Sequence, residues 1–228
     1  ELSFVEKLVF SNYKIRSKAT QVNGETDDNF KLVSKNNIFF FKIYPKNTDK
    51  EFVKFQIDIL HSLKKNKKTS SNTPTLNGNV VGSFHDKDNN LRFFRMNSWI
   101  EGRLWSKVNP INKSLRFELG EVSAKILNEL KKVKKGYLRE KFDWDLQNFL
   151  WTEKYINEID ISKRNVVKKL ISNFKHQEEK YKQLRKSIIH NDINDNNIIV
   201  SEDLKVPSIN GIIDFGDCTH TQLINEVA

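Results

Sequence analysis

Cysteine and long apolar segments are the scarcest features of this 228-residue chain. Cys218 is its one cysteine, which excludes an internal disulfide framework and favours a reducing compartment. Since Cys218 follows the carboxylate of Asp217 and has no basic neighbour in sequence, we do not predict a nucleophilic thiol there. No apolar run approaches the roughly 18 residues that a membrane span needs, and the first residues lack a signal-peptide pattern. We therefore expect a cytoplasmic protein with no membrane partner.

Arginine clusters are also missing, although the chain is basic. The net charge is +10 at pH 7, but lysine supplies most of it, and no arginine cluster with interleaved aromatic residues appears. The densest lysine runs are Lys64-Lys65, Lys67-Lys68 and Lys131 to Lys135. We interpret them as a solvated surface that also attracts polyphosphate, and we predict no nucleic-acid partner.

The remaining composition is that of a folded chain with a strand-rich first part. An apolar fraction of 37% and 16 phenylalanines argue against disorder, and the length suggests one or two domains. Short apolar runs separated by turn residues predict strands over 19–22, 30–33, 38–44, 80–82 and 91–96. One helix is predicted from Asp49 to Leu63, where apolar residues recur at helical spacing and Thr48 or Asp49 would cap the first turn.

After about residue 96 the pattern changes to amphipathic helices. Apolar spacing predicts helices over 112–133 and from about Trp144 to Ile156, followed by a long, highly charged helix over 163–186. Strands followed by helices indicate an α+β fold with two lobes. We predict a small antiparallel-sheet N-lobe with one helix over residues 1–96, and a mainly helical C-lobe over 97–228 that carries a catalytic hairpin.

The most informative segment runs from Ile188 to Asp217 and joins the motif HNDINDNN to IIDFGD. Transfer of a γ-phosphoryl group to a hydroxyl needs a carboxylate near the acceptor oxygen and metal ions that hold the triphosphate. Asp192 supplies the carboxylate, while the amide oxygen of Asn197 and the carboxylate of Asp214 are suitable magnesium ligands. The pattern therefore predicts phosphoryl transfer with Asp192 as the catalytic residue and a Mg²⁺ site at Asn197 and Asp214.

Strand-like runs flank both polar loops, which places the catalytic groups at the ends of a hairpin. The predicted strands are Ile198–Val200 and Ile212–Ile213, and residues 201–211 form the exposed turn between them. An alternative is that the Asn and Asp residues of 192–197 are only turn formers, since both types favour loops. His190 before this cluster and the IDFGD motif after it favour the catalytic interpretation.

Lys42 is the candidate for the nucleotide end of the site. It lies in the apolar run from Ile38 to Tyr44, where an unpaired ammonium facing a dry core would be costly. Holding the α- and β-phosphates would account for it. The alternative is that Lys42 points outward from a half-buried strand, which strand alternation permits. The catalytic hairpin favours the phosphate role.

Two further segments are candidates for nucleotide contacts. The hairpin from Gln21 to Phe30 would cover the phosphates, but its single glycine, Gly24, does not make a GxGxxG loop and is also typical of a simple turn. The lobes meet around residues 95–99, so the backbone at Met96 and Ser98 is predicted to contact the nucleobase, whereas Trp99 is predicted to pack in the core.

Taken together, these motifs resemble those of the aminoglycoside phosphotransferase and choline kinase superfamily, which has a protein-kinase-like fold. HNDINDNNIIV with GIIDFGD resembles the superfamily's usual HGDLHxxN and IDFxD. The ordered set GETDDNF, FFFKIYP, MNSWIEGRLW, FDWDLQNFLW, HNDINDNN and IIDFGD looks more closely like hydroxylysine kinase and its bacterial relatives. The resemblance spans nearly the whole chain, and its motifs are more specific for the superfamily than for the subfamily.

The resemblance implies a role for each motif residue. By it, Asp192 is the catalytic base, Asn197 and Asp214 are metal ligands, and Lys42 anchors the phosphates. The implied donor is ATP or GTP, and the implied cofactor is Mg²⁺. Some relatives are fused to a class III aminotransferase, so such a domain is a further expected partner.

Relatives phosphorylate hydroxyls of small, often amine-bearing molecules. The carboxylates of Asp195, Asp217 and Glu226 are therefore possible acceptor-binding groups, with helix caps or salt bridges as the alternative roles. We predict a small-molecule kinase acting on hydroxylysine or a related amino alcohol. The alternatives are another small acceptor (choline, ethanolamine, homoserine, a sugar or an aminoglycoside) or a nucleotide-binding remnant without transfer activity.

The sequence departs from the family pattern at three places. Asn191 replaces the usual glycine, and asparagine tolerates a left-handed backbone better than most residues. Lys54 replaces the glutamate that usually pairs with the phosphate lysine, and Glu51 and Asp58 are the alternative partners on the same helix. The chain ends at residue 228 inside an expected helix, before the region that forms much of the acceptor pocket in relatives, so we expect a fragment or a truncated product.

Overall fold

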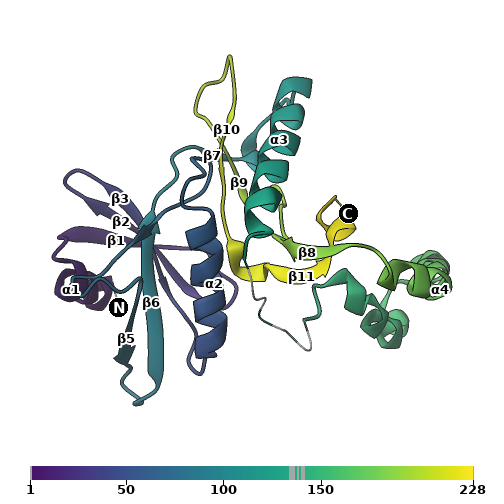
Figure 1. Cartoon of the computed structure of the whole chain (residues 1–228), viewed down its shortest axis with the longest axis horizontal. Helices are drawn as coiled ribbons and strands as arrows, with labels where there is room; N and C mark the ends of the chain where they lie inside the picture. Colours follow the sequence, from purple (N-terminus) through teal and green to yellow (C-terminus); the bar gives the residue numbers. More distant parts are fainter. Residues whose placement is uncertain (1, 134–136, 138, 140–141, 228) are drawn as a thin grey trace.

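The computed structural model describes residues 2–133, 137, 139 and 142–227 and has the two-lobed α+β architecture expected from the sequence (Figure 1). The N-lobe is an antiparallel sheet in which β1-β2-β3-β6-β4 follow one another, and β5 also pairs with β6. Its strands are β1 (Ser17–Val22), β2 (Asp28–Ser34), β3 (Ile38–Ile43), β4 (Asn72–Thr73), β5 (Val81–His85) and β6 (Leu91–Ser98). Lys134 and Lys135 of the predicted basic run lie outside the described residues.

The N-lobe has a helix that the sequence analysis missed, so the expectation of one helix was incomplete. Helix α1 (Leu2–Tyr13) buries Val5, Val9 and Tyr13 against one face of the sheet. These residues recur at intervals of four, as expected for a helix. Phe4 and Phe10, however, are exposed on the same helix, which makes it apolar on several sides and hides the buried stripe in the sequence.

The two faces of the N-lobe sheet contact different parts of the protein. On β3, Phe41 and Ile43 point into the cluster that α1 covers, so the pleat turns Lys42 to the opposite face. That opposite face looks toward helix α2 (Lys50–Ser62), which lies between the sheet and the C-lobe (Figure 1). Lys42 therefore faces the space between the lobes and does not enter the α1-side core.

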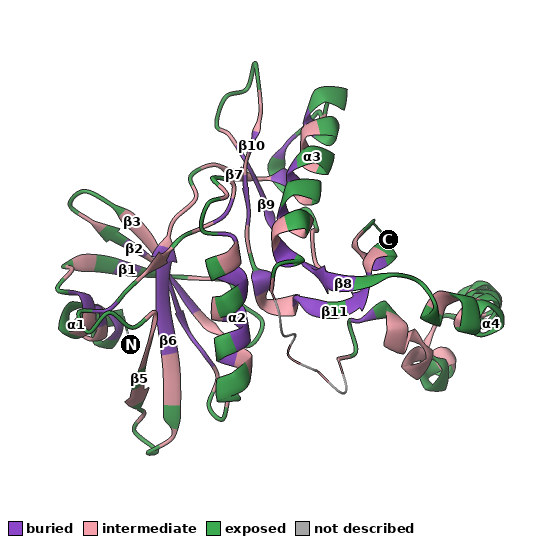
Figure 2. Ribbon diagram, in the orientation of Figure 1, coloured by how far each residue is buried: buried purple, intermediate pink, exposed green. Residues whose placement is uncertain are grey.

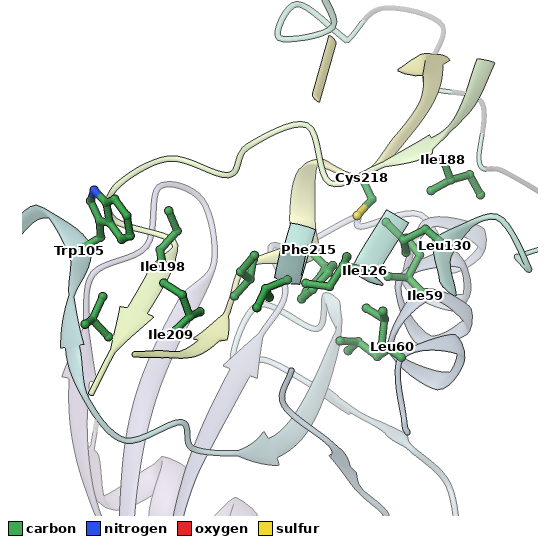
Figure 3. Close-up of a cluster of buried hydrophobic side chains, with 14 of the residues drawn as sticks. Ile59, Leu60, Trp105, Ile126, Leu130, Ile188, Ile198, Ile209, Phe215 and Cys218 are labelled. Carbon is green, nitrogen blue, oxygen red and sulfur yellow. The ribbon is translucent and has the colours of Figure 1, made fainter. Parts of the chain in front are cut away.

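Helix α2 has the predicted bounds and fastens the two lobes together. Asp49 is its N-cap, and its carboxylate accepts the N–H of Glu51 at 2.9 Å. Ile59 and Leu60 pack against Ile126, Leu130 and Phe215 of the C-lobe in one buried cluster (Figure 3). Fully burying such an apolar side chain is worth roughly 1.5–3 kcal/mol, so the cluster holds α2 firmly beside the IDFGD strand end.

The C-lobe combines helices with two small antiparallel sheets, of β10-β9-β7 and of β11-β8. Its helices are α3 (Lys113–Leu130) and α4 (Ile161–Lys182), with 3₁₀ helices η1 (Trp105–Lys107), η2 (Leu146–Glu158), η3 (Phe215–Asp217) and η4 (Leu223–Val227). Its strands are β7 (Arg103–Leu104), β8 (Lys186–Ile189), β9 (Ile198–Val200), β10 (Ile209–Ile212) and β11 (Thr219–Gln222). In the described part of the chain, none of the helices could cross a bilayer, judged by length and apolar content.

Helix α3 confirms one helical prediction, and two others need correction. Asn112 caps α3 by accepting the N–H of Leu115 at 2.7 Å. The helix predicted from about Trp144 to Ile156 is instead the 3₁₀ helix η2, because apolar spacings of three fit both kinds of helix. The charged helix α4 ends at Lys182, since the following residues pair with β11, a partner that the sequence does not reveal.

The predicted catalytic hairpin is present as β9 and β10. Strand β10 begins at Ile209, inside the segment that was predicted to be turn, because its backbone pairs with β9 from Val200 onward. After η3 the chain forms β11 and η4 in place of the expected helix. Buried residues gather on β8, β9, β11 and the inner side of α2, around the strand ends that carry the polar loops (Figure 2). The lobe boundary at residue 96 stays a prediction, since β6 continues through Ser98.

Candidate active site

His190 is buried at the start of the HNDINDNN loop and fixes its backbone. Its Nε2 lies 2.9 Å from the carbonyl oxygen of Ile213, and its Nδ1 accepts the N–H of Asp192 at 3.2 Å. Since a carbonyl oxygen only accepts, Nε2 carries the proton and Nδ1 is bare. Burial lowers the pKa of His190, in agreement with a neutral ring. The imidazole therefore ties this loop to the strand that ends in Asp214.

The carboxylate of Glu226 holds the same loop from the other side. The N–H groups of His190 and Asn191 donate to its two oxygens at 3.2 and 2.8 Å. Asn191 has the left-handed backbone (φ 69°) anticipated for the residue that replaces glycine. Burial raises the pKa of Glu226 to about 7, although the two N–H bonds lower it. Of the two predicted roles for Glu226, these contacts favour the structural one over acceptor binding.

Asp192 and Asn197 form the centre of the loop. The Nδ2 of Asn197 donates to Oδ2 of Asp192 at 2.7 Å and to its backbone oxygen at 3.0 Å, while Asn194 donates to Oδ1 at 2.7 Å. Each carboxylate oxygen keeps a lone pair for a further donor. Burial raises the pKa of Asp192, and the nearby charges of Asp214 and Glu25 act in the same direction, while the amide bonds lower it.

The IDFGD turn brings Asp214 and Asp217 to the same place. Asp214 is exposed and has a left-handed backbone (φ 60°), and its Oδ1 accepts the N–H of Gly216 at 3.2 Å. Arg139 donates to the Gly216 carbonyl oxygen at 2.9 Å and lies 3.4 Å from Oδ1 of Asp217. Burial raises the pKa of Asp217, and Arg139 opposes that shift. Asp217 is thus already paired with a cation, whereas the described residues provide no ion pair for Asp214.

The oxygen atoms of the loop suit a hard divalent cation. Because the amide nitrogen of Asn197 is committed to Asp192, its Oδ1 is left as a potential metal ligand, and the carboxylate of Asp214 is a second candidate. No group of three or more His, Cys, Asp or Glu side chains able to hold a metal occurs among the described residues. A cation here would therefore complete its coordination with water and phosphate oxygens, as Mg²⁺ commonly does.

Asp195, the remaining acidic residue of the loop, has an exposed side chain. Its backbone oxygen accepts the N–H of Ser106 at 2.9 Å, which fixes the loop to η1. The side chain is therefore held at the surface next to the catalytic loop. Its predicted contact with an acceptor stays a prediction.

Lys42 is 3% exposed and does not point outward. Its Nζ lies 2.5 Å from Oδ2 of Asp27, in the loop between β1 and β2. Glu51 and Asp58, the two substitutes that the sequence suggested, are both exposed on α2. Among the described residues, neither forms an ion pair with Lys42. The expectation of a partner on α2 is therefore wrong, because the ammonium meets the β1–β2 loop instead.

The β1–β2 loop curls over an open hollow of about 460 Å³ that is lined by its own residues. A Cβ on Gly24 would lie 2.4 Å from Nδ2 of Asn29 and 2.6 Å from the backbone oxygen of Asp27, so a larger residue would force the loop to move. Glu25 acts on the pKa of Asp192, which requires the loop to reach toward the catalytic loop. These positions agree with a loop that covers the phosphates.

The side chains of Met96 and Ser98 make their contacts within the protein. The Met96 side chain is fully buried in the α1-side core. The N–H of Ser98 donates to the Ser71 carbonyl oxygen at 2.9 Å, and its hydroxyl accepts the N–H of Ser71 at 2.9 Å. Neither side chain is directed into the space between the lobes, and backbone contact at these residues stays a prediction.

Sequence reasoning missed three residues that shape the site. Asp27 pairs with Lys42, Arg139 clamps the IDFGD turn, and Gln56 is buried on α2, where its Oε1 accepts the hydroxyl of Tyr44 at 2.8 Å. Asp27 was visible in GETDDNF, but nothing in the motif distinguishes it from Asp28. No sequence motif indicated a role for Arg139, because its contacts join segments that are far apart in sequence.

Comparisons with known proteins agree with this geometry. The phosphotransferase enzyme family matches residues 18–228. Hydroxylysine kinase of Mus musculus is 32% identical over 145 residues, a match that covers 59% of this chain and 38% of the mouse protein. This chain therefore matches well under half the length of that relative.

Solved structures share the fold. An amicoumacin kinase in complex with AMP-PNP, Ca²⁺ and Ami superimposes with a TM-score of 0.67 at 15% identity, covering 99% of this chain and 66% of that one. A microcompartment-associated aminopropanol kinase gives a TM-score of 0.73 at 14% identity, covering 96% and 70%. At such low identity these matches establish the architecture alone.

Proposed function

Since this chain belongs to the phosphotransferase enzyme family, we propose that it transfers the γ-phosphoryl group of ATP or GTP to a hydroxyl of a small, amine-bearing acceptor such as hydroxylysine. The observation that carries the proposal is the arrangement around Asp192. The Asp192 carboxylate accepts a hydrogen bond from the amide nitrogen of Asn197, and the amide oxygen of Asn197 stays available. The negative charge of Asp214 acts on the same carboxylate and raises its pKa. The contact between Asp192 and Asn197 and the nearby charge of Asp214 support a site that has a carboxylate for the hydroxyl and oxygen ligands for a cation.

Asp192 orients the acceptor hydroxyl and accepts its proton. Both carboxylate oxygens are fixed by amide donors at 2.7 Å, so the group is aimed before an acceptor arrives. A half-buried base with a raised pKa takes up a proton more readily than an exposed one. In the N-lobe, Lys42 on β3 holds the phosphates that leave with the nucleotide.

Asn197 and Asp214 would hold a divalent cation, for which Mg²⁺ is the expected species. When bound, such a cation neutralises the charge of the triphosphate and keeps its oxygens in place. The amide nitrogen of Asn197 orients the amide by bonding Asp192, so the same residue serves both groups. The left-handed backbone at Asp214 turns its carboxylate out of strand β10 toward the catalytic loop.

An amine-bearing acceptor suits the charge of this region. The side chain of Asp195 is exposed on the catalytic loop, and Asp217, although paired with Arg139, lies close enough to Asp192 for the two carboxylates to influence each other. An ammonium would offset this negative charge, whereas an anionic acceptor would be repelled. The 32% identity with the mouse hydroxylysine kinase supports hydroxylysine as the first candidate.

The test is a kinase assay in which the protein encoded by the whole gene is given a panel of acceptors. ATP or GTP with Mg²⁺ is supplied together with 5-hydroxylysine, ethanolamine, choline, homoserine, a sugar or an aminoglycoside. Nucleotide consumption and the mass of the phosphorylated acceptor are measured. Lysine is the matched control, because it has the same charged groups as hydroxylysine and lacks the hydroxyl that receives the phosphoryl group.

The proposal expects phosphorylated hydroxylysine and no product from lysine. Turnover of a different acceptor without hydroxylysine turnover would retain phosphoryl transfer but replace the acceptor. Mg²⁺-dependent nucleotide binding with no product from any acceptor would instead favour a binding protein without transfer activity.

A further inference from the structure

Lys42 is buried beside a second cation, Arg95, and its ammonium contacts the half-buried carboxylate of Asp27. Arg95 lies directly opposite Lys42 on β6 and is 6% exposed. Its guanidinium donates to neutral groups, the hydroxyl of Tyr44 at 2.8 Å and the side-chain oxygen of Asn97. Among the described residues, Asp27 is the acidic group within ion-pair distance of Lys42, and Arg95 has no such partner. The carboxylate of Asp27 therefore offsets the repulsion between the Lys42 ammonium and the neighbouring guanidinium of Arg95.

Helix α2 does not offer Lys42 an alternative partner. Gln56, its buried polar residue, is occupied by Tyr44 and is neutral. The acidic residues Glu51 and Asp58 are exposed. The lysine thus lacks the charge partner on the helix that family resemblance implied.

We propose that Asp27 is the positioning residue for Lys42: it holds the ammonium aimed at the phosphates of the bound nucleotide, in the role that a helix carboxylate was expected to fill. This inference rests on the proposed function, since it assigns Lys42 to phosphate binding. It adds a residue of the β1–β2 loop to the machinery of the site.

The location of Asp27 suits this role. Asn29 is the cross-strand neighbour of Lys42 in the β2–β3 pair, and Asp27 lies in the loop directly before β2, from which its carboxylate reaches the Lys42 ammonium. The side chain of Lys42 is 4% exposed and that of Asp27 is 21% exposed. Removing the carboxylate would leave a buried ammonium without a counter-charge, which is strongly unfavourable.

The pair is compatible with nucleotide binding. An ammonium has three N–H donors, and Asp27 uses one of them, so the others stay available for phosphate oxygens. Asp27 thus remains in place when the nucleotide binds, and its loss weakens nucleotide binding. A carboxylate that merely occupied the phosphate position would behave in the opposite way, because its loss would strengthen binding.

The experiment compares Asp27→Asn with Asp28→Asn in the intact protein. Asp28 is the adjacent residue at the start of β2, and its carboxylate pairs with Arg92 at 2.8 Å, so the control removes a neighbouring ion pair without touching Lys42. We expect Asp27→Asn to lower kcat/KM for the nucleotide by about 10-fold or more, with the acceptor KM unchanged. Asp28→Asn should change it by less than about 2-fold, and Asp27→Glu should recover part of the loss.

A second measurement does not depend on activity. Thermal unfolding of Asp27→Asn, Lys42→Met and the double variant forms a double-mutant cycle. We expect Asp27→Asn to lower the unfolding midpoint by several degrees more than Asp28→Asn in the wild-type background, and to have little effect when Lys42 is Met. Should Asp27→Asn alone fail to fold, the double variant regains folding, because no unpaired ammonium is left.

Tighter nucleotide binding by Asp27→Asn overturns the inference, as do unchanged kinetics or additive effects in the unfolding cycle. If the unfolding cycle shows coupling between Asp27 and Lys42 but the wild-type protein neither binds nor consumes nucleotide, the proposed function is refuted. The phosphate role of the pair is then refuted with it. The two failures are therefore distinguishable.

Discussion

Replacing Glu226 with glutamine isolates the titration of the carboxyl group that holds the catalytic loop. Both oxygens of Glu226 accept backbone N–H groups, from His190 and Asn191. Burial nevertheless raises its pKa from the ordinary 4.5 to about 7. In the folded protein the carboxyl group therefore keeps its proton over a pH range in which the unfolded chain has already lost it.

The sign follows from proton linkage. Between pH 4.5 and 7 the native state binds more protons than the unfolded state at this residue, so its contribution to stability is complete below pH 4.5 and is lost as the pH rises through 7. At about 1.4 kcal/mol per unit, the loss amounts to about 3 kcal/mol. His190, whose pKa burial lowers, titrates in the opposite direction, but it is present in both proteins and cancels in the difference.

The assay is urea unfolding of wild type and Glu226→Gln at a series of pH values from 4 to 8. We expect the unfolding free energy of the wild type, relative to the variant, to fall by about 3 kcal/mol across this range. Glu202→Gln is the control, because Glu202 is exposed on the β9–β10 loop and its replacement should change stability little. A difference between wild type and Glu226→Gln that stays constant with pH would refute the reasoning.

Three further substitutions test other parts of the site. Asn197→Ala should raise the Mg²⁺ concentration needed for half-maximal turnover, because one oxygen ligand is lost; an unchanged titration would argue against a metal at this residue. Asn191→Val should lower the unfolding free energy by about 1–3 kcal/mol and Asn191→Gly far less, since φ is 69°; equal effects would argue against backbone strain as the cause. Gly24→Val should raise the KM for the nucleotide, because its side chain would displace Asn29, and an unaltered KM would separate this loop from the nucleotide.

The parts that sequence predicted well are those in which one segment carries its own signal. Helix α2 was predicted with Thr48 or Asp49 as its cap, and Asp49 is the cap, since periodicity and capping are local. The β9–β10 hairpin and the left-handed Asn191 were likewise local features. Asp192 and Asn197 meet because only a short loop separates them, so their contact was also within reach of the sequence.

The parts that sequence did not predict depend on pairing between distant segments. Strand β8 was not predicted, and its first residue, Lys186, was assigned to the preceding charged helix, because its partner β11 lies far along the chain. The partner of Lys42 was sought on α2, where family resemblance placed it, whereas the folded β1–β2 loop brings Asp27 to the ammonium. Glu226 was taken for a possible acceptor contact, since nothing in its neighbourhood indicates that it binds the backbone at His190.

The measurement that bears most directly on phosphoryl transfer compares wild type with Asp192→Asn in the intact protein, using hydroxylysine, Mg²⁺ and ATP or GTP. Asparagine keeps the size of the side chain but cannot take the proton of the acceptor hydroxyl. We expect turnover to fall by about 100-fold or more, with nucleotide affinity nearly unchanged. Turnover at the wild-type rate by Asp192→Asn would contradict the assignment of Asp192 and the phosphoryl transfer built on it.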